Sequence, residues 1–542
     1  MSCSKIFSGE LPELTYEVIK YFKNDFSTLY SCILVNRLWC RLAIPLLWED
    51  PFSIPTKNYK FIYVYLHNLN DDIKTELTEY EININLLLSN TLFNYPSFIK
   101  YLNIWTIIFS VWDWFETVLR AEKKYISYDL DTACDLKRLI IMSLFKIFIE
   151  NEVNLHVLEF DILIHRDYNS FYHDILELIL QNPNFIHNVR NLKLIHFASP
   201  GYYDNRNECA SIKNLILQII SLHQNLKKIF LSYNSFASYK PLLLSKDYNC
   251  SNTLNTIILF HIDFNGLINL DIVFEQLNVL ESIHIVYCYS LKNGFIQQII
   301  NLTKPFKLKS LFISDVSLSI DESLPLLLQK TGGYLENFGC IFRFGCGLSL
   351  KQQLLESVLK YCKNIKFLDS CGFGNQIIHQ AFNLIENIKQ SLNYLTISVF
   401  NYHQLNHVSD NNIECSSFVL QHLGQILPSK LKYLSLILHI KVNDFEVFLQ
   451  NSQDILIKKL LIKNNEGQDI LPYLKEYIMK KKRVKYLAVM SSYKNIFVDG
   501  YHNNKDLFIM KDVVEEFKLY DIKVKNYYGS LINTYDFIKE ID

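Results

Sequence analysis

Short apolar runs with one internal spacing recur along most of the chain. Their aliphatic residues occupy positions i, i+3 and i+5, as in the template L-x-x-L-x-L, and each run is predicted to form a strand. Segments with helical periodicity lie between them, such as SIKNLILQIISLHQN and LKQQLLESVLKYCKN. The pattern predicts an α/β fold. The runs begin at Leu155, Val189, Leu226, Leu254, Leu280, Leu308, Leu335, Ile365, Leu392, Leu431, Ile457 and Val484.

The distance between successive runs is nearly constant. From Leu226 to Leu392 the steps are 28, 26, 28, 27, 30 and 27 residues, followed by one of 39 and two of 26 and 27. A repeat of this length cannot cover its own apolar side, so neighbouring repeats are predicted to stack into a curved solenoid with parallel strands on its concave face. The region resembles the leucine-rich repeat family, in the variety with a full helix per unit. The Asn or Cys that this family carries after the strand is present as Asn234 and Cys288 and absent from several other units.

The outward positions of the predicted strands vary between repeats. Side chains alternate along a strand, so the residue between the last two aliphatic positions points away from the core. These outward residues share no chemistry, which suits a surface shaped for one large protein partner. An aromatic patch is the candidate substrate-binding face, and the alternative is that a loop or the C-terminal tail covers it. The patch consists of Phe230, Phe260, His284 and Phe312.

The first fifty residues carry more apolar side chains than so short a segment can bury. Glu13 to Tyr21 is predicted to be a helix with Pro12 in its first turn, and a second helix is predicted from Leu29 to Ala43. A third short helix is predicted around Leu46 to Trp48. About forty residues form only a marginal core, so part of this surface is expected to face a partner or the next segment.

Several residues of this segment follow a known motif order. Leu11-Pro12, Glu17-Val18, Val35 to Trp39, Leu42-Ala43 and Leu47-Trp48 resemble the F-box family over residues 9–50. The resemblance implies a small all-helical domain that docks a Skp-type adaptor and through it a cullin-RING ubiquitin ligase of the SCF type. The alternative is that the segment caps the solenoid, with Trp48 filling the junction with residues 51–100. By the resemblance, the adaptor contact would come from Leu11, Pro12, Val18, Phe22, Leu29, Cys32, Val35 and Trp39.

Composition narrows the functional classes. The chain has 542 residues, of which 49% are hydrophobic and 20% charged, and a net charge of −1 gives no general attraction to nucleic acid or anionic lipid. Its twelve cysteines form no C-x-x-C pair, so neither zinc nor disulfides are expected. We expect residues 51–150 to form a helical linker or N-terminal cap and residues 151–542 the solenoid.

The sequence contains no signal peptide and no apolar run long enough for a membrane span. The nearest candidate, LIIMSLFKIFI from Leu139, is broken by Lys146. We therefore expect a soluble intracellular protein in the cytoplasm, the nucleus or both. The basic run KKKRVK at Lys480 is a candidate nuclear localisation signal or a solvated helix end.

The remaining chemical signals are weak. His403 and His407 have a metal-binding spacing but no third ligand nearby, and the glycine-rich segments at Gly345 and Cys371 lack a complete phosphate-loop motif. Cys371 and His379 lack a third orienting group for nucleophilic catalysis. We expect no catalytic residue, metal or cofactor.

The sequence leads to one hypothesis and one alternative. The hypothesis is a non-catalytic receptor that recruits the ligase through its N-terminal segment and holds an unidentified target protein on the repeats. Such a receptor promotes ubiquitination only by keeping the target close to the ligase. The alternative is a protein-interaction scaffold that has no connection with a ligase.

Overall fold

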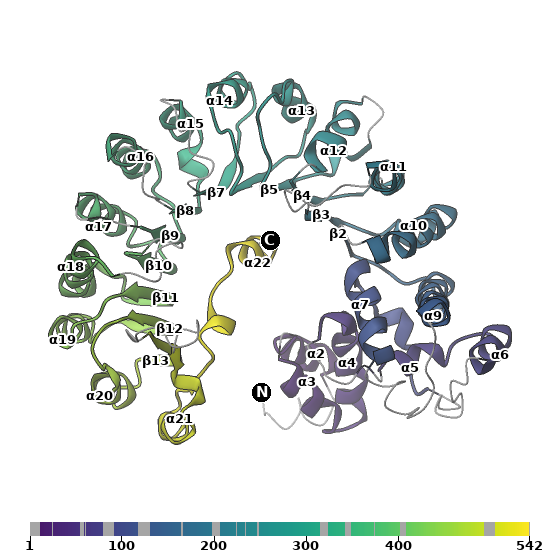
Figure 1. Cartoon of the computed structure of the whole chain (residues 1–542), viewed down its shortest axis with the longest axis horizontal. Coiled ribbons are helices and arrows are strands. Elements are labelled where there is room, and N and C mark those ends of the chain that lie inside the picture. The colour runs from purple at the N-terminus through teal and green to yellow at the C-terminus, as the bar shows by residue number, and fades with distance from the viewer. Residues whose placement is uncertain are drawn as a thin grey trace. The chain divides into compact units, whose positions relative to one another are not determined.

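The computed structural model divides the chain into two compact units, Met1–Asn255 and Thr256–Asp542. Each unit is described separately (Figure 1). The residues described are 11–23, 25–54, 59, 61–79, 91–116, 130–163, 166–197, 206–223, 225–233, 235–245, 249–314, 323–341, 348–372, 374, 376–400, 408–492 and 504–540.

Unit 1 begins with three short helices, α2 (Pro12–Lys20), α3 (Phe26–Ile33) and α4 (Arg37–Leu47). The side chain of Asp25 caps α3 by accepting a hydrogen bond from the Thr28 amide at 3.1 Å, and Asn36 caps α4 through the Trp39 amide at 2.9 Å. These helices enclose a core of their own. Its buried members are Ile19, Leu29, Cys32, Trp39, Ala43 and Leu46.

The rest of unit 1 builds four parallel strands. The sheet follows chain order, with Tyr101 paired with Val157, Leu158 with Leu192, and Lys193 with Phe230. The elements are η1 (Pro51–Ser53), α5 (Phe61–Leu66), α6 (Asp71–Glu79), η3 (Tyr95–Phe98), β1 (Tyr101–Asn103), α7 (Ile104–Trp114), α9 (Leu130–Glu150), β2 (Val157–Leu163), α10 (Arg166–Gln181), η5 (Pro183–Ile186), β3 (Asn191–Phe197), α11 (Arg206–Leu222), β4 (Lys228–Ser232), α12 (Ser235–Leu244) and η6 (Asn249–Asn252).

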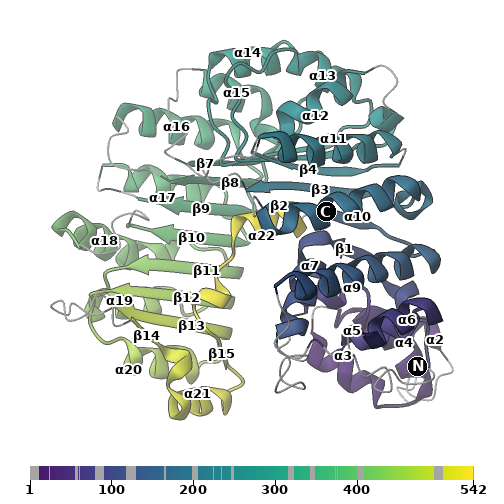
Figure 2. The same cartoon turned by 45° about the vertical axis from the view of Figure 1, so that its right-hand side comes forward.

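Unit 2 continues the alternation of strand and helix. Figures 1 and 2 show its strands along the inner side of an arc and its helices on the outer side. The strands are β5 (Thr256–Phe260), β6 (Ser282–Val286), β7 (Leu308–Ser314), β8 (Asn337–Ile341), β9 (Phe367–Cys371), β10 (Tyr394–Ser398), β11 (Lys430–Leu438), β12 (Leu456–Asn465) and β13 (Val484–Ser492). The helices are α13 (Leu270–Gln276), α14 (Asn293–Ile300), α15 (Leu324–Thr331), η8 (Gly332–Tyr334), α16 (Leu348–Tyr361), α17 (Ile378–Asn387), α18 (Asp410–Ile426), α19 (Val442–Asn451), α20 (Leu471–Tyr473) and η9 (Leu474–Met479).

The C-terminal segment of unit 2 leaves the repeat pattern. β14 (Asn504–Asp506) pairs with β13 in the antiparallel direction, and β15 (Lys523–Val524) pairs with β13 in the parallel direction. Between them lie η10 (Leu507–Ile509) and α21 (Lys511–Lys518), and after them η11 (Tyr528–Ser530) and α22 (Thr534–Glu540). In Figure 1 this yellow segment begins at the end of the arc of unit 2, where α21 lies, and its last part, with α22, lies on the inner side of the arc.

The predicted alternation of strand and helix is confirmed. Every run of the L-x-x-L-x-L pattern forms a strand, from β2 to β13, and the strands from β5 to β13 pair in parallel with their neighbours in the chain. The strand β1 lies within residues 51–150, where only helices were predicted. Among the described residues no helix combines the length and apolarity needed to cross a bilayer.

The turn after several strands depends on backbone conformation rather than on a fixed residue type. Tyr233, His261, Tyr287 and Gly372 each follow a strand directly and have φ values of 48°, 52°, 52° and 79°. This left-handed conformation turns the chain out of the sheet and is accessible to residues other than Asn, although at some cost. Cys288 fills the position expected for the family, and its Sγ donates a hydrogen bond to the Leu259 carbonyl at 3.3 Å. Asn234 lies outside the described residues.

Candidate protein-binding surfaces

Exposed apolar side chains lie on α2, on α3 and in the turn between α3 and α4. On α2 these residues are separated by four and three positions, so they share one helix face, while Thr15 and Ile19 on the adjacent face are buried. The most exposed members are Tyr21, at 87% exposure, and Leu34, at 73%. We call this set the N-terminal apolar surface. It consists of Leu14, Val18, Tyr21, Tyr30, Leu34 and Val35.

The predicted adaptor-contact residues divide into three groups. Val18 and Val35 are exposed and belong to the N-terminal apolar surface. Leu11, Pro12 and Phe22 are half-buried. The remaining three residues are buried in the three-helix core, so the expectation that they present a contact surface is wrong. They are Leu29, Cys32 and Trp39. The sequence reasoning did not select Leu14, Tyr21, Tyr30 or Leu34, although the helical spacing of Leu14, Val18 and Tyr21 was a usable signal.

The three-helix core is joined to the rest of unit 1 through Trp48 and Glu49. The Trp48 ring lies 5.5 Å from the Tyr65 ring and 4.4 Å from the Tyr95 ring, measured between centroids. Glu49, whose side chain is 5% exposed, forms ion pairs with Lys23 at 2.6 Å and with Lys100 at 2.5 Å. The expectation that Trp48 fills the junction with residues 51–100 is therefore confirmed.

The four residues predicted to form an exposed aromatic patch are all buried. Phe230 lies in unit 1, and the other three lie in unit 2. His284 is 1% exposed, and its Nδ1 lies 2.7 Å from the hydroxyl of Ser310, which also accepts a hydrogen bond from Asn337 at 2.9 Å. The register of β6 with β7 pairs Phe312 with Val286 and not with His284, and it shifts by one residue between Ile283 and His284. The expectation of exposure is corrected for Phe230, Phe260, His284 and Phe312.

A larger aromatic row crosses the inner face of unit 2. Phe367, Tyr394 and Tyr433 occupy paired positions on β9, β10 and β11. Each is the residue directly before the second aliphatic position of its run, so it points to the same side of the strand as the outward residues chosen from the sequence. The alternation of side chains along each strand could have identified these three residues. They were missed because candidates were taken from only one outward position per repeat.

The C-terminal segment covers this aromatic row. The Phe537 ring lies 4.6 Å from the Phe367 ring and 5.3 Å from the Tyr394 ring, and the Tyr535 ring lies 5.0 Å from the Phe260 ring, between centroids. These contacts are mostly edge-on, the preferred aromatic geometry. The alternative that the C-terminal tail covers the predicted patch is thus confirmed for Phe260.

Asp369 is a buried carboxyl group on the same face. It follows Phe367 by two residues on β9 and is 7% exposed. Burial raises its pKa to about 6, although the Cys371 thiol, which donates a hydrogen bond to it at 3.5 Å, acts in the opposite direction. Its neighbours in register are Gly339 on β8 and Thr396 on β10, neither of which carries a compensating charge.

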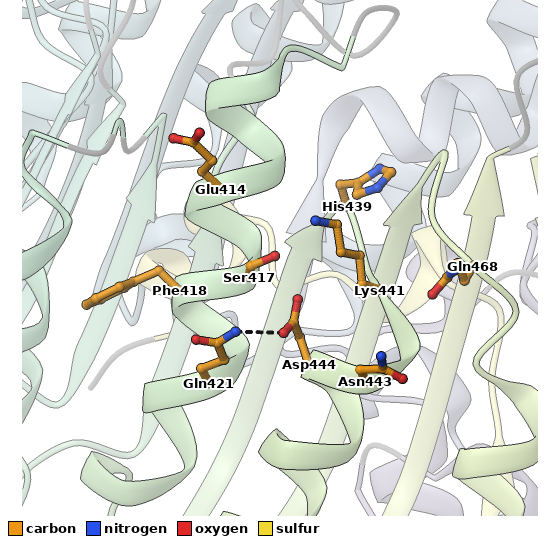
Figure 3. A pocket seen from close by; sticks show the side chains of 9 residues that line it. All are labelled: Glu414, Ser417, Phe418, Gln421, His439, Lys441, Asn443, Asp444 and Gln468. Atoms are coloured by element: carbon orange, nitrogen blue, oxygen red, sulfur yellow. Dashed lines mark hydrogen bonds between the residues drawn. The ribbon is translucent and has the colours of Figure 1, made fainter.

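A separate hollow lies on unit 2 between α18 and the segment after β11 (Figure 3). Its volume is about 720 Å³, and its lining residues are half-buried or exposed and polar except for Phe418. Gln421 donates a hydrogen bond to Asp444 at 2.7 Å, and Gln468 accepts one from the Val442 amide at 2.8 Å. These side chains tie neighbouring repeats together.

Among the described residues, the other chemical candidates from the sequence do not assemble into a site. No group of three or more His, Cys, Asp or Glu side chains in the described part of the chain could hold a metal ion. His403, His407 and Gly345 lie outside that part. The His379 ring packs against Phe418 of the next helix, while Cys371 is buried beside Asp369.

The basic run at Lys480 is partly structural. Arg483 is 9% exposed and donates hydrogen bonds to the Ser452 carbonyl at 2.5 Å and to the Leu449 carbonyl at 3.3 Å. Lys480, Lys481 and Lys482 are exposed ahead of β13.

No protein-family model matches the chain, and no curated protein matches it.

Proposed function

We propose that the chain is a non-catalytic receptor subunit of an SCF-type cullin-RING ubiquitin ligase. The N-terminal apolar surface would dock a Skp-type adaptor, and the inner face of the repeats would hold the target protein. The observation that carries the proposal is that this surface stays exposed although the helices beneath it already have a complete core. Contiguous exposed apolar side chains mark interaction sites on folded proteins.

The composition of the surface supports a protein partner. Tyr21 and Tyr30 each combine a large apolar ring with a hydroxyl group, and tyrosine is enriched at interface hot spots. Leu34 and Val35 lie in the turn before α4, where the Asn36 cap fixes the backbone. A fixed apolar turn beside two helices loses little conformational entropy when it binds.

The test is co-purification of a Skp-type adaptor and a cullin with the full-length chain. We expect Leu34→Glu to abolish co-purification, because it places a charge at the centre of an apolar contact. Ile268→Glu is the matched control, since Ile268 is 63% exposed and belongs to unit 2. If neither the native chain nor the control retains the adaptor, the proposal is wrong. Trp39 is unsuitable for this test because its substitution would disrupt the core.

A protein-interaction scaffold without a ligase is the second candidate, and the junction at Trp48 and Glu49 favours it. These contacts would be needed if the N-terminal helices served only as a cap. Deleting residues 1–50 removes both side chains and would destabilise unit 1 under either function. Surface substitutions such as Leu34→Glu therefore separate the two candidates better than a deletion does.

A further inference from the structure

The C-terminal segment of unit 2 has a base that packs on the last repeat and a distal part that contacts earlier strands. At the base, the carboxylate of Asp506 accepts hydrogen bonds from the Asn526 side chain at 2.8 Å and from the Tyr527 amide at 2.9 Å. Tyr527 is 1% exposed and packs into a cluster with Tyr433 and Met490. Residues up to this point are therefore part of the fold of the last repeat.

The distal part, residues 531–540, runs back across the inner face of unit 2. The Ile532 amide donates a hydrogen bond to the Tyr433 hydroxyl at 3.3 Å, and the hydroxyls of Thr534 and Tyr287 lie 3.1 Å apart. Tyr433 lies on β11, and Tyr287 directly follows β6, so ten residues cross several strands. We call residues 531–540 the distal tail.

The structure of the distal tail depends on the surface beneath it. Its helix α22 has seven residues, and a helix of this length does not form by itself in water. Thr534 and Ile538, which are four positions apart, are buried, whereas Asp536 is exposed. The inner face thus binds a short helix through one side, as peptide-binding grooves do.

The surface under the distal tail has the composition of a binding site. Its aromatic side chains come from five strands or their ends, and without the tail they would leave a contiguous apolar patch of a kind that folded proteins seldom expose. Tyr and Phe supply large contact area with only two side-chain torsions each. The residues that contact the tail are Phe260, Tyr287, Phe367, Tyr394 and Tyr433.

We propose that the inner face of unit 2 is a binding site for a short helical segment of another protein. This segment carries two aromatic side chains two residues apart, and the distal tail occupies the same site as an intramolecular competitor. The distal tail shows this spacing of aromatic residues in Tyr535 and Phe537. The Tyr535 ring contacts Phe260, and the Phe537 ring contacts Phe367 and Tyr394. The proposal rests on the proposed function in that it assigns the target-binding site, and it does not depend on adaptor docking.

The test uses a labelled peptide with the sequence of residues 531–540, LINTYDFIKE, and the full-length chain. In the variant Tyr535→Ala/Phe537→Ala we expect the tail to leave the site. The peptide should bind this variant about tenfold or more tightly than it binds the native chain, since a tethered competitor acts at an effective concentration of about millimolar. The control variant is Leu519→Ala, whose side chain is 83% exposed, and it should bind as the native chain does.

Two further measurements make each outcome decisive. A peptide with alanine at both aromatic positions should not bind any variant. Thr534→Val removes only the contact with the Tyr287 hydroxyl and should increase peptide binding by a smaller factor, which keeps the test valid if the double variant loses structure by circular dichroism. Equal peptide affinity for the native chain and both tail variants would overturn the proposal, as would the absence of binding to a folded double variant.

Adaptor binding by the same proteins separates this proposal from the proposed function. The tail variants should retain the Skp-type adaptor, and Leu34→Glu should bind the peptide as the native chain does. Loss of the peptide effect with adaptor binding intact refutes the competitor alone. Normal peptide behaviour without adaptor binding refutes the ligase function alone.

Discussion

Asp369 should make the stability of unit 2 depend on pH, and the variant Asp369→Asn should remove this dependence. The ionised carboxylate is disfavoured at its buried position on β9, where Cys340, Cys371 and the hydroxyls of Tyr287 and Tyr433 are the titratable groups that interact with it. None of these groups is cationic. Asparagine keeps the size of the side chain and cannot ionise.

The magnitude follows from the pKa. A rise from 3.8 to about 6 corresponds to about 3 kcal/mol of unfolding free energy, at 1.36 kcal/mol per pKa unit. The pKa of Asp369 is higher in the folded chain than in the unfolded chain. Its contribution to the stability of the folded state is therefore fully present below pH 3.8 and is lost as the pH rises through about 6. We therefore expect Asp369→Asn to be more stable than the native chain at pH 7.5 by up to about 3 kcal/mol, with the difference disappearing near pH 4.

The assay is the urea midpoint of unfolding between pH 4 and pH 8, followed for the native chain, Asp369→Asn and the exposed control Asp536→Asn. The control should follow the native chain at every pH. A variant that is less stable than the native chain at pH 7.5, or one whose gain is the same at every pH, would show that the carboxyl group is not held in its neutral form by burial.

Three other substitutions test the packing. Gly339→Ala should destabilise unit 2 by about 1–3 kcal/mol in urea unfolding, because the new methyl group would lie 2.4 Å from the Phe312 ring, and normal stability would contradict this packing. Arg483→Met should cost about 1–3 kcal/mol through two lost hydrogen bonds, whereas Lys482→Met at an exposed position should be neutral. Glu49→Gln should lower the thermal midpoint of unit 1, because it weakens two ion pairs between a buried carboxylate and partly exposed lysines; the loss should be about 3 kcal/mol or less, and an unchanged midpoint would count against their importance.

The repeats could be predicted from the sequence because their signal is local and repeated. Each strand from β2 to β13 carries the same apolar spacing, except that Ser370 takes the third position in β9, and its buried side follows directly from the alternation of side chains. The strand β1 obeys the same template through Ile99, Leu102 and Ile104, all of which are buried. It was missed because it lies outside the regular period, between segments with helical character.

The exposure of individual side chains could not be predicted in the same way. Trp39 and Val35 belong to one motif, yet Trp39 is buried in the three-helix core and Val35 faces solvent. Whether each of these side chains is buried or exposed depends on how α2 and α3 pack against α4. The covering of Phe260 by Tyr535 joins residues 275 positions apart in the chain, and no local pattern specifies such a contact.

Amide hydrogen exchange of the full-length chain is the most direct test of the proposed docking of a Skp-type adaptor on the N-terminal apolar surface. Adding the purified adaptor should slow exchange at the amides between Leu14 and Val35 and leave those of unit 2 unchanged. The same measurement on Leu34→Glu should show no protection. Unchanged exchange between Leu14 and Val35 in the native chain at saturating adaptor, or protection confined to unit 2, would contradict the claim.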